Sequence, residues 1–181
     1  MHIDCEKITI RTAATDDADV LARMGKLTFR KSYADIIPPE DLASYTATAF
    51  SPDLIRSEIR DQATIYLLAA VDMNICGYAK LQPTAPPPQI TAPRPVELMR
   101  LYVMPGFTGN GIGSKLIRTG LIVAAEAHYH SCWLRVWRGN KSAINFYRNW
   151  RFGEVGREPY QVGKTSETVL LMVRTLQDLK K

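Results

Sequence analysis

One short glycine-rich segment constrains the fold of this chain more than any other part of its sequence. Residues 106–117 read GFTGNGIGSKLI, between a strand-like stretch at residues 97–103 and a helix-like stretch that begins near Ile112. Glycine carries no Cβ, so its backbone can approach a bound group closely, and the first amides of a helix lack an intrahelical partner. Because those amides lie at the positive end of the helix dipole, the segment predicts a loop that binds a pyrophosphate. The same glycines also suit an ordinary tight turn.

A second block of residues makes the first more specific. Residues 140–152 read NKSAINFYRNWRF, and a strand-like stretch at residues 132–137 precedes them. Together the two blocks resemble the GNAT superfamily of acetyl-coenzyme A-dependent N-acetyltransferases. The first block is similar to the pattern Arg/Gln-x-x-Gly-x-Gly/Ala of that superfamily, and the second to Asn-x-x-Ala-x-x-Phe-Tyr-x-x-x-Gly-Phe. The pairing of the two blocks is specific, whereas either half alone is not.

Two positions depart from the pattern of the family. Thr108 stands where the superfamily usually carries Arg or Gln, so we expect Lys115, Arg118 or another basic group to supply positive charge to the phosphates. Arg151 stands where the second block usually has Gly, directly after a predicted helix. A left-handed residue at such a helix end costs a non-glycine residue roughly 1 kcal/mol. Either the helix ends differently here, or the fold absorbs the strain.

The resemblance implies that acetyl-CoA is the cosubstrate and that the strand before the glycine loop contacts its pantetheine arm. The implied contacts are backbone groups of Leu101, Tyr102 and Val103, with the Leu101 N–H directed at the thioester oxygen. Asn140 is a predicted N-cap and an implied cofactor contact, and both roles can hold. The other implied cofactor contacts are Thr108, Gly109, Asn110, Gly111, Ile112, Gly113, Ser114 and Tyr147.

Two side chains are candidates for the acid–base chemistry. The resemblance implies Tyr147 as the general acid that protonates the departing thiolate, although Phe146 and Tyr147 could also be an aromatic pair that packs a helix on the sheet. Glu97 is the candidate general base, because some family members carry a glutamate there that takes the proton of the amine through water. Strand alternation predicts one apolar face shared by Glu97, Met99, Leu101 and Val103.

The order of the predicted elements indicates the fold class. The predicted strands are residues 7–12, 64–71, 75–81, 97–103, 133–137, 152–155 and 168–173. Helices are expected to begin at residues 15, 38, 52, 112 and 140, the first with a capping hydroxyl from Thr15 and the fourth running to His128. This order predicts an α/β fold with a mixed sheet of six or seven strands, antiparallel early and with a parallel β-α-β step around the glycine loop. It matches the GNAT fold over one domain, residues 1–181.

Composition and charge narrow the functional classes. With 181 residues, 46% of them hydrophobic and 23% charged, the chain can bury the core of one ordered domain. The net charge of +5 fits an anionic partner such as coenzyme A. Nucleic acid is the competing interpretation, but the basic residues are scattered rather than grouped with aromatic residues. We therefore expect no nucleic acid as partner, and the resemblance implies a small-molecule amine.

The cysteine and histidine residues predict neither disulfides nor a metal site. Cys5, Cys76 and Cys132 lie far apart and are odd in number, so we expect reduced thiols in a cytoplasmic protein, with the latter two as core residues. His128 and His130 have no third ligand nearby, which argues against a metal. No signal peptide is expected, and no apolar run approaches the ~18 residues of a membrane helix.

The acceptor amine is less constrained than the cosubstrate. Residues 28–33, 42–45, 49–50 and 168–176 look like the bacterial branch whose members acetylate spermidine and spermine. A polycation requires carboxylates, and the candidates are Asp35, Glu40, Asp41, Asp53 and Glu58. These residues could equally be capping and surface charges. The alternative acceptors are a peptide N-terminus or another small amine, and the alternative to an enzyme is a non-catalytic module that binds acyl-CoA. A homodimer is possible, but no heptad or large apolar stripe in the sequence demonstrates one.

Overall fold

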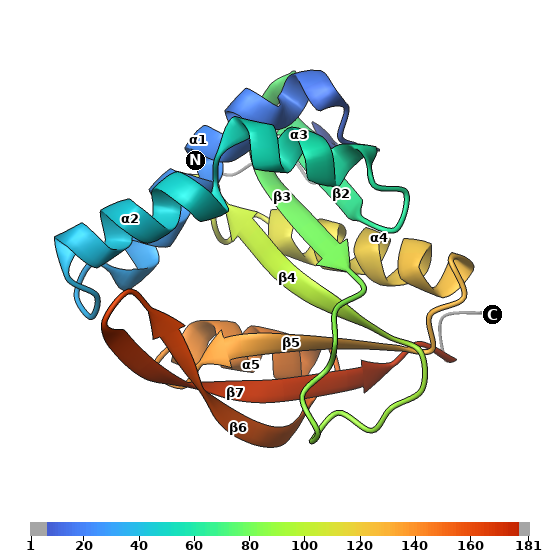
Figure 1. The fold of residues 1–181 in the computed structure, drawn as a ribbon. Coiled ribbons are helices and arrows are strands. Elements are labelled where there is room, and N and C mark those ends of the chain that lie inside the picture. Colours follow the sequence, from blue (N-terminus) through green and yellow to red (C-terminus); the bar gives the residue numbers. More distant parts are fainter. Residues whose placement is uncertain (1–6, 178–181) are drawn as a thin grey trace.

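The computed structural model describes residues 7–177, and Cys5 lies outside the described residues. The centre of the fold is a seven-stranded mixed sheet in the order β1-β2-β3-β4-β5-β7-β6 (Figure 1). The pairing of β4 with β5 is parallel, and every other pairing in this sheet is antiparallel. The predicted α/β class and mixed sheet are confirmed.

The elements follow the predicted order. The strands are β1 (Ile8–Thr12), β2 (Ile65–Val71), β3 (Asn74–Gln82), β4 (Pro95–Val103), β5 (Ser131–Trp137), β6 (Gly153–Val162) and β7 (Thr165–Thr175). The helices are the 3-10 turn η2 (Thr15–Asp17), α1 (Ala18–Tyr33), α2 (Pro39–Ala49), α3 (Pro52–Arg60), α4 (Ile112–Glu126) and α5 (Lys141–Asn149).

Two helix ends differ from the prediction. The Thr15 hydroxyl does not cap the first helix; the Asp17 carboxylate accepts the Ala14 N–H at 2.7 Å and two hydrogen bonds from Arg11 instead. An acidic side chain suits this position because the first amides of a helix are partly positive. The predicted end of α4 at His128 is also wrong: the helix ends at Glu126, and His128 has a left-handed backbone with φ of +63°.

The last two strands are much longer than predicted. They form a hairpin that turns at Gly163, whereas the sequence pattern indicated only residues 152–155 and 168–173. The strand β6 lies at the edge of the sheet, and charged residues alternate along its exposed face. It also contains Pro159. Proline is tolerated in an edge strand, because one side of that strand needs no ladder hydrogen bonds. A pattern search for apolar runs therefore missed most of this hairpin.

Helices cover both faces of the sheet (Figure 1). One core joins α4 to the sheet through Ile112, Leu116 and Leu121, and it extends to Ile144 of α5. On the opposite face, Leu21 of α1 and Ile55 of α3 pack against aromatic residues of β2 and β3. Burial of such large apolar side chains contributes about 1.5–3 kcal/mol each. The two layers fix the central strands, so that the ends of β4 and β5 have defined positions.

Strand β4 contains one extra residue, and this overturns a prediction. The register pairs Lys80 with Arg100 but Leu81 with Leu98, which leaves Met99 as a bulge. Leu98 and Leu101 consequently both pack into the core beneath α4. The predicted common face of Glu97, Met99, Leu101 and Val103 is therefore wrong: Glu97 lies on the opposite face from Leu101 and Val103, because a bulge shifts the alternation by one residue.

Strands β4 and β5 diverge after a short paired segment. Their parallel ladder runs from Pro95 opposite Ser131 to Glu97 opposite Trp133 and stops there. Beyond that point β4 stays paired with β3, and β5 with β7 (Figure 1). In this stretch the edge of β4 that faces β5 makes no ladder hydrogen bonds within the described residues. Backbone groups of Leu101–Val103 on that edge can therefore contact a ligand.

Candidate functional site

A cavity of about 820 Å³ opens where β4 and β5 diverge. Four parts of the chain form its walls: the end of β4, the glycine loop, the start of α5 and one face of α1. We call it the larger cavity. The residues that line it are Thr28, Lys31, Ser32, Leu101, Tyr102, Val103, Pro105, Gly106, Phe107, Thr108, Gly109, Gly111, Gly113, Ser114, Asn140, Ser142, Ala143, Phe146 and Tyr147.

The glycine loop has a backbone that only glycine adopts without strain. Gly109 and Gly111 have φ of +82° and +81°, a left-handed conformation that costs other residues about 1–2 kcal/mol. A Cβ on Gly109 would meet no heavy atom within 4 Å, so the backbone angle, not crowding, requires glycine there. Gly111 is the N-cap of α4, and no described side chain caps the first amides of that helix. These amides can therefore bind an anion.

Ten of the predicted cofactor contacts line the larger cavity, and two do not. The side chain of Ile112 is 1% exposed and belongs to the core beneath α4. The Asn110 amide donates to the Phe107 and Thr108 carbonyl oxygens, both at 3.2 Å. Asn110 thus holds the shape of the loop from within. The backbone amide of Ile112 still lies in the first turn of α4.

Asn140 combines the two roles that the sequence indicated. Its side-chain oxygen accepts the Ala143 N–H at 3.0 Å, which makes it the N-cap of α5. Asn140 also lines the larger cavity, together with Ser142 and Ala143 from the first turn of the helix. The start of α5 is therefore fixed against the cavity by a local hydrogen bond.

Tyr147 lies on α5 and lines the same cavity. Burial raises the pKa of its phenol well above the ordinary value, and the nearby Tyr33 phenol and Cys132 thiol raise that pKa further. The phenol therefore stays protonated at neutral pH and can donate a proton. Its ring also packs edge-on against Phe146, with ring centroids 5.5 Å apart, and against Phe152 at 5.8 Å. The predicted aromatic pair of Phe146 and Tyr147 is therefore present, and it is compatible with a role of the phenol in the cavity.

The end of α5 has the geometry of a glycine cap, although Arg151 occupies the position. Arg151 has φ of +61°, its N–H donates to the Arg148 carbonyl oxygen at 2.8 Å, and the Phe152 N–H donates to that of Tyr147 at 3.0 Å. This pair of bonds defines a Schellman motif, whose left-handed residue is usually glycine. The helix therefore ends as in the family pattern, and the arginine backbone carries the strain.

Glu97, the candidate base, lines neither this cavity nor the smaller one described below. Its carboxylate is 5% exposed, with one oxygen 2.6 Å from the Arg135 guanidinium and the other accepting the Thr84 hydroxyl at 2.6 Å. Arg135 also contacts Glu158 at 2.5 Å. The role of Glu97 as a base stays a prediction, and its observed contacts link β4 to β5 at the point where the strands part.

The basic groups expected near the phosphates lie elsewhere. The Lys115 ammonium donates to the Ile8 carbonyl oxygen at 3.0 Å, and Arg118 is exposed on α4 outside the residues that line the cavity. Lys31 is the charged side chain among the described lining residues. Sequence reasoning did not assign Thr28, Lys31 and Ser32 to this cavity. Their spacing of three and four residues along α1, which puts them on one helix face, was the available signal.

The five carboxylates considered for a polycation do not line the larger cavity. Asp41 accepts the Lys164 N–H at 2.9 Å, and Asp53 pairs with Arg56 at 2.8 Å. Glu58 pairs with the buried ammonium of Lys80 at 2.6 Å, beneath α3. Asp35 and Glu40 are exposed. Most of these carboxylates are thus capping or surface charges, which was the other explanation that the sequence allowed. Acidic residues are common at such positions because they stabilise helix N-termini.

The model of the acetyltransferase (GNAT) family matches residues 30–152 of this chain. The chain belongs to this family. An uncharacterised N-acetyltransferase of Mycobacterium bovis is 31% identical over 160 residues, covering 88% of this chain and 98% of that protein. A spermidine N(1)-acetyltransferase of Thermoplasma acidophilum is 26% identical over 144 residues, covering 77% and 84%.

Solved structures confirm the GNAT fold of this acetyltransferase. The PaiA N-acetyltransferase of Thermoplasma acidophilum, in complex with coenzyme A, superposes with a TM-score of 0.73 at 22% identity. The match covers 93% of this chain and 98% of that structure. Among the described residues, no helix is both long and apolar enough to cross a membrane.

The residues of the larger cavity fit acetyl-CoA, the cosubstrate of this acetyltransferase. Its volume of about 820 Å³ lies within the range of about 300–1,000 Å³ that is common for small-molecule sites. The uncapped first turn of α4 would offer amides to the diphosphate, and the free edge of β4 would offer backbone groups to the pantetheine arm. The bound cosubstrate would supply the activated acetyl group.

Proposed function

We propose that this acetyltransferase transfers an acetyl group from acetyl-CoA to a primary amine by direct attack within a ternary complex. The observation that carries the proposal is the larger cavity, whose wall includes the glycine loop, the free edge of β4 and Tyr147. One wall suits a diphosphate, the second a thioester oxygen, and the third a departing sulfur. All three open into one space, so the amine can attack without a covalent enzyme intermediate.

The proposed reaction balances as one acyl transfer. The neutral amine nitrogen attacks the thioester carbonyl carbon, a C–N bond forms, and the C–S bond breaks. Tyr147 gives its phenolic proton to the departing sulfur, and the proton lost by the amine nitrogen returns to the phenolate through water. The products are an amide and the free thiol of coenzyme A, and the enzyme returns to its starting protonation state.

The backbone of β4 stabilises the developing charge in this proposal. As the amine attacks, negative charge gathers on the thioester oxygen, and a fixed N–H donor nearby lowers the barrier. The Leu101 N–H is the proposed donor, because Leu101–Val103 line the larger cavity on the stretch of β4 that no longer pairs with β5. A backbone donor held by the β3–β4 ladder needs little reorganisation during the reaction.

Glu97 remains the proposed general base: it would take the proton that the ammonium form of the acceptor loses before attack, and release that proton to solvent afterwards. Both of its oxygens already accept hydrogen bonds from Arg135 and Thr84. Proton transfer from the amine to Glu97 would therefore pass through water rather than by direct contact. Bulk water is the competing acceptor of that proton, and the turnover rate of a Glu97 variant separates the two.

We propose a polyamine as the acceptor class. The support is the 26% identity to a protein named as a spermidine N(1)-acetyltransferase. A peptide N-terminus or another small amine is the alternative acceptor. The free, buried thiols of Cys76 and Cys132 support the proposal of a reducing, cytoplasmic compartment.

A turnover panel tests the proposed function. Release of the coenzyme A thiol is followed with acetyl-CoA and, in separate assays, spermidine, amino acids, aminoglycosides and peptides. We expect turnover with spermidine above that with peptides. Transfer to peptide N-termini but not to spermidine would contradict the polyamine assignment. Calorimetric binding of acetyl-CoA without turnover on any amine would identify a non-catalytic acyl-CoA module instead.

A further inference from the structure

A second, smaller cavity lies between α1 and the β6–β7 hairpin. Its volume is about 30 Å³, which is room for about two water molecules or one ammonium group. We call it the aromatic pocket. The residues that line it are Phe29, Tyr33, Ile37, Trp137, Tyr160, Val162, Thr165, Glu167 and Val169. They come from α1, the segment after it, the end of β5 and both strands of the hairpin, so only the folded chain assembles them.

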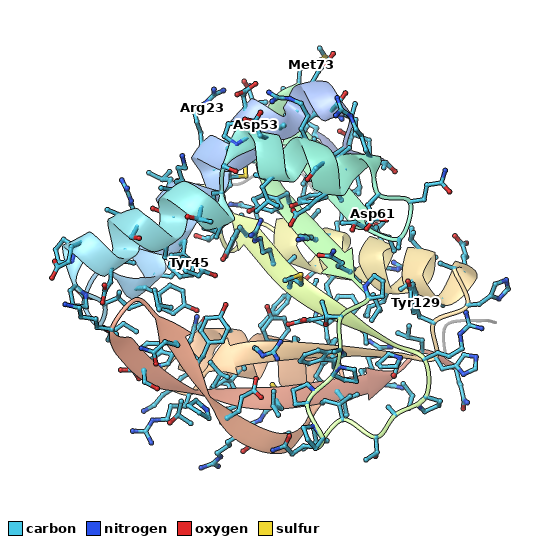
Figure 2. The ribbon with its side chains drawn as sticks, viewed as in Figure 1. Arg23, Tyr45, Asp53, Asp61, Met73 and Tyr129 are labelled. Carbon is cyan, nitrogen blue, oxygen red and sulfur yellow. The ribbon has the colours of Figure 1, made fainter. Side chains whose placement is uncertain are left out.

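Aromatic rings form much of this wall. The ring centroids of Phe29 and Tyr33 lie 4.5 Å apart, and those of Tyr33 and Trp137 lie 6.4 Å apart. The Tyr45 ring stacks on Phe29 at 4.7 Å, and its hydroxyl lies 3.2 Å from that of Tyr160, which joins α2 to β6. Figure 2 shows Tyr45 on the side of α2 that faces the hairpin. The faces of such rings attract cations.

One carboxylate accompanies these rings. Glu167 of β7 is the charged side chain among the described residues that line the aromatic pocket. The Trp137 Nε1–H donates to its Oε2 at 3.0 Å, which fixes the orientation of the carboxylate and leaves Oε1 able to accept another donor. Rings together with a negative charge favour a cationic group and disfavour an anionic one.

The aromatic pocket adjoins the larger cavity through α1. Thr28, Lys31 and Ser32 of this helix line the larger cavity, and Phe29 and Tyr33 line the aromatic pocket. The two cavities therefore lie on neighbouring faces of one helix, and an acceptor that extends past α1 would enter both.

The charge of Glu167 determines which amine the aromatic pocket can hold. A carboxylate nearby favours the protonated form of an amine, and a protonated amine has no lone pair with which to attack. An amine bound beside Glu167 is therefore not the one that is acetylated. The acceptor must carry its reacting amino group elsewhere along the molecule, near Tyr147.

We infer that the aromatic pocket binds the non-reacting ammonium group of an acceptor with at least two amino groups, an aliphatic diamine or polyamine. The inference rests on the proposed function and deepens it, because it names the group that selects the acceptor. Glu167 is the specificity residue, and the rings of Tyr33 and Trp137 exclude water from the bound ammonium.

The test compares a diamine with the monoamine of the same chain length. Initial rates are measured for 1,4-diaminobutane and 1-aminobutane with the wild-type chain, with Glu167→Gln and with Glu40→Gln. Glutamine keeps an oxygen for the Trp137 N–H and removes only the charge. Glu40 is exposed on α2 and gives the same change of net charge outside the aromatic pocket.

We expect the wild-type kcat/KM to be about tenfold higher for the diamine, since a hydrogen bond to a charged partner has about this effect. Glu167→Gln should raise KM for the diamine about tenfold, with kcat nearly unchanged and the monoamine unaffected. Glu40→Gln should resemble the wild type. Equal effects of Glu167→Gln on both amines, or no preference of the wild type, would overturn the inference. Should Glu167→Gln fail to fold, Tyr33→Leu tests the same selective loss.

A binding measurement separates this inference from the proposed function. Calorimetry with 1,4-diaminobutane is performed on the wild type and on Glu167→Gln, each saturated with coenzyme A. If no amine is acetylated but the diamine binds and Glu167→Gln abolishes binding, the proposed function fails and the aromatic pocket is still an ammonium site. If amines are acetylated but Glu167→Gln binds the diamine as tightly as the wild type, only the inference fails.

Discussion

The two cavities of this acetyltransferase are built in different ways. Most of the larger cavity comes from one continuous stretch of chain, from β4 through the glycine loop to α5. The aromatic pocket combines α1 with the end of β5 and the β6–β7 hairpin, which are far apart in the sequence. The first site therefore has a local motif, and the second has none. A cosubstrate site of this kind can be predicted from sequence, whereas the acceptor site requires the fold.

The largest effect is expected from the local site. Tyr147→Phe should lower kcat about 10²–10⁴-fold, because a positioned acid contributes about that factor. The affinity for acetyl-CoA should be nearly unchanged, since the ring and its packing against Phe146 and Phe152 are kept. Steady-state rates and calorimetry measure the two quantities. Unchanged turnover would remove Tyr147 from the mechanism.

The ion pair at the point where β4 and β5 part predicts a loss of stability. Glu97→Gln should lower the free energy of unfolding by about 2 kcal/mol, because Arg135 loses a buried partner and keeps only Glu158. Urea denaturation measures this change. The proposal of a base at Glu97 further requires that Glu97→Gln lowers kcat at neutral pH. A folded variant with unchanged kcat would contradict that role.

The glycine loop predicts a smaller effect, with its own control. Gly109→Ala should weaken the binding of acetyl-CoA about tenfold, since a left-handed alanine costs about 1–2 kcal/mol and shifts the loop. Gly153→Ala, outside the larger cavity, is the control: its Cβ would meet no heavy atom within 4 Å and its φ is not positive. Calorimetry on both variants makes the comparison. Equal affinities would indicate that the loop does not bind the diphosphate.

The smallest effect concerns the departure from the family pattern. Arg151→Gly should raise the free energy of unfolding by about 0.5–1 kcal/mol, the relief of left-handed strain less the entropy that glycine gains in the unfolded chain. His128→Gly at the end of α4 should have a similar effect, because its φ is +63°. Thermal and urea unfolding measure both changes. A loss of stability in Arg151→Gly would mean that its side-chain contacts outweigh the strain.

Much of the fold was predictable because apolar periodicity and turn residues encode it locally. The β2–β3 hairpin, the N-caps at Ser51 and Asn140, and the step from β4 through α4 to β5 all have such signals. The bulge at Met99 has none, since one extra residue leaves no mark in an apolar strand. The edge strand β6 was hidden by its charged outer face.

The sites divide in the same way. Gly109, Asn140 and Tyr147 follow from two sequence blocks, and all three line one cavity. Glu167 and Trp137 could not be predicted to meet, because their contact depends on the register of β5 with β7. The carboxylates that looked suitable for a polycation were chosen by position in the helical segment. Asp41, Asp53 and Glu58 have partners elsewhere, and none of the five lines the larger cavity.

The bulge in β4 divides this strand into two halves in which odd-numbered side chains point to opposite faces of the sheet. Before Met99 the odd-numbered Glu97 points away from α4, and after it the odd-numbered Leu101 points toward α4. Deleting Met99 would bring Arg100 directly after Leu98, opposite Lys80 and Leu81, so the ladder would become continuous and Leu101 would still point toward α4. One codon can therefore be removed here without turning the strand over, whereas removing a paired residue such as Arg100 would exchange the two faces of everything that follows.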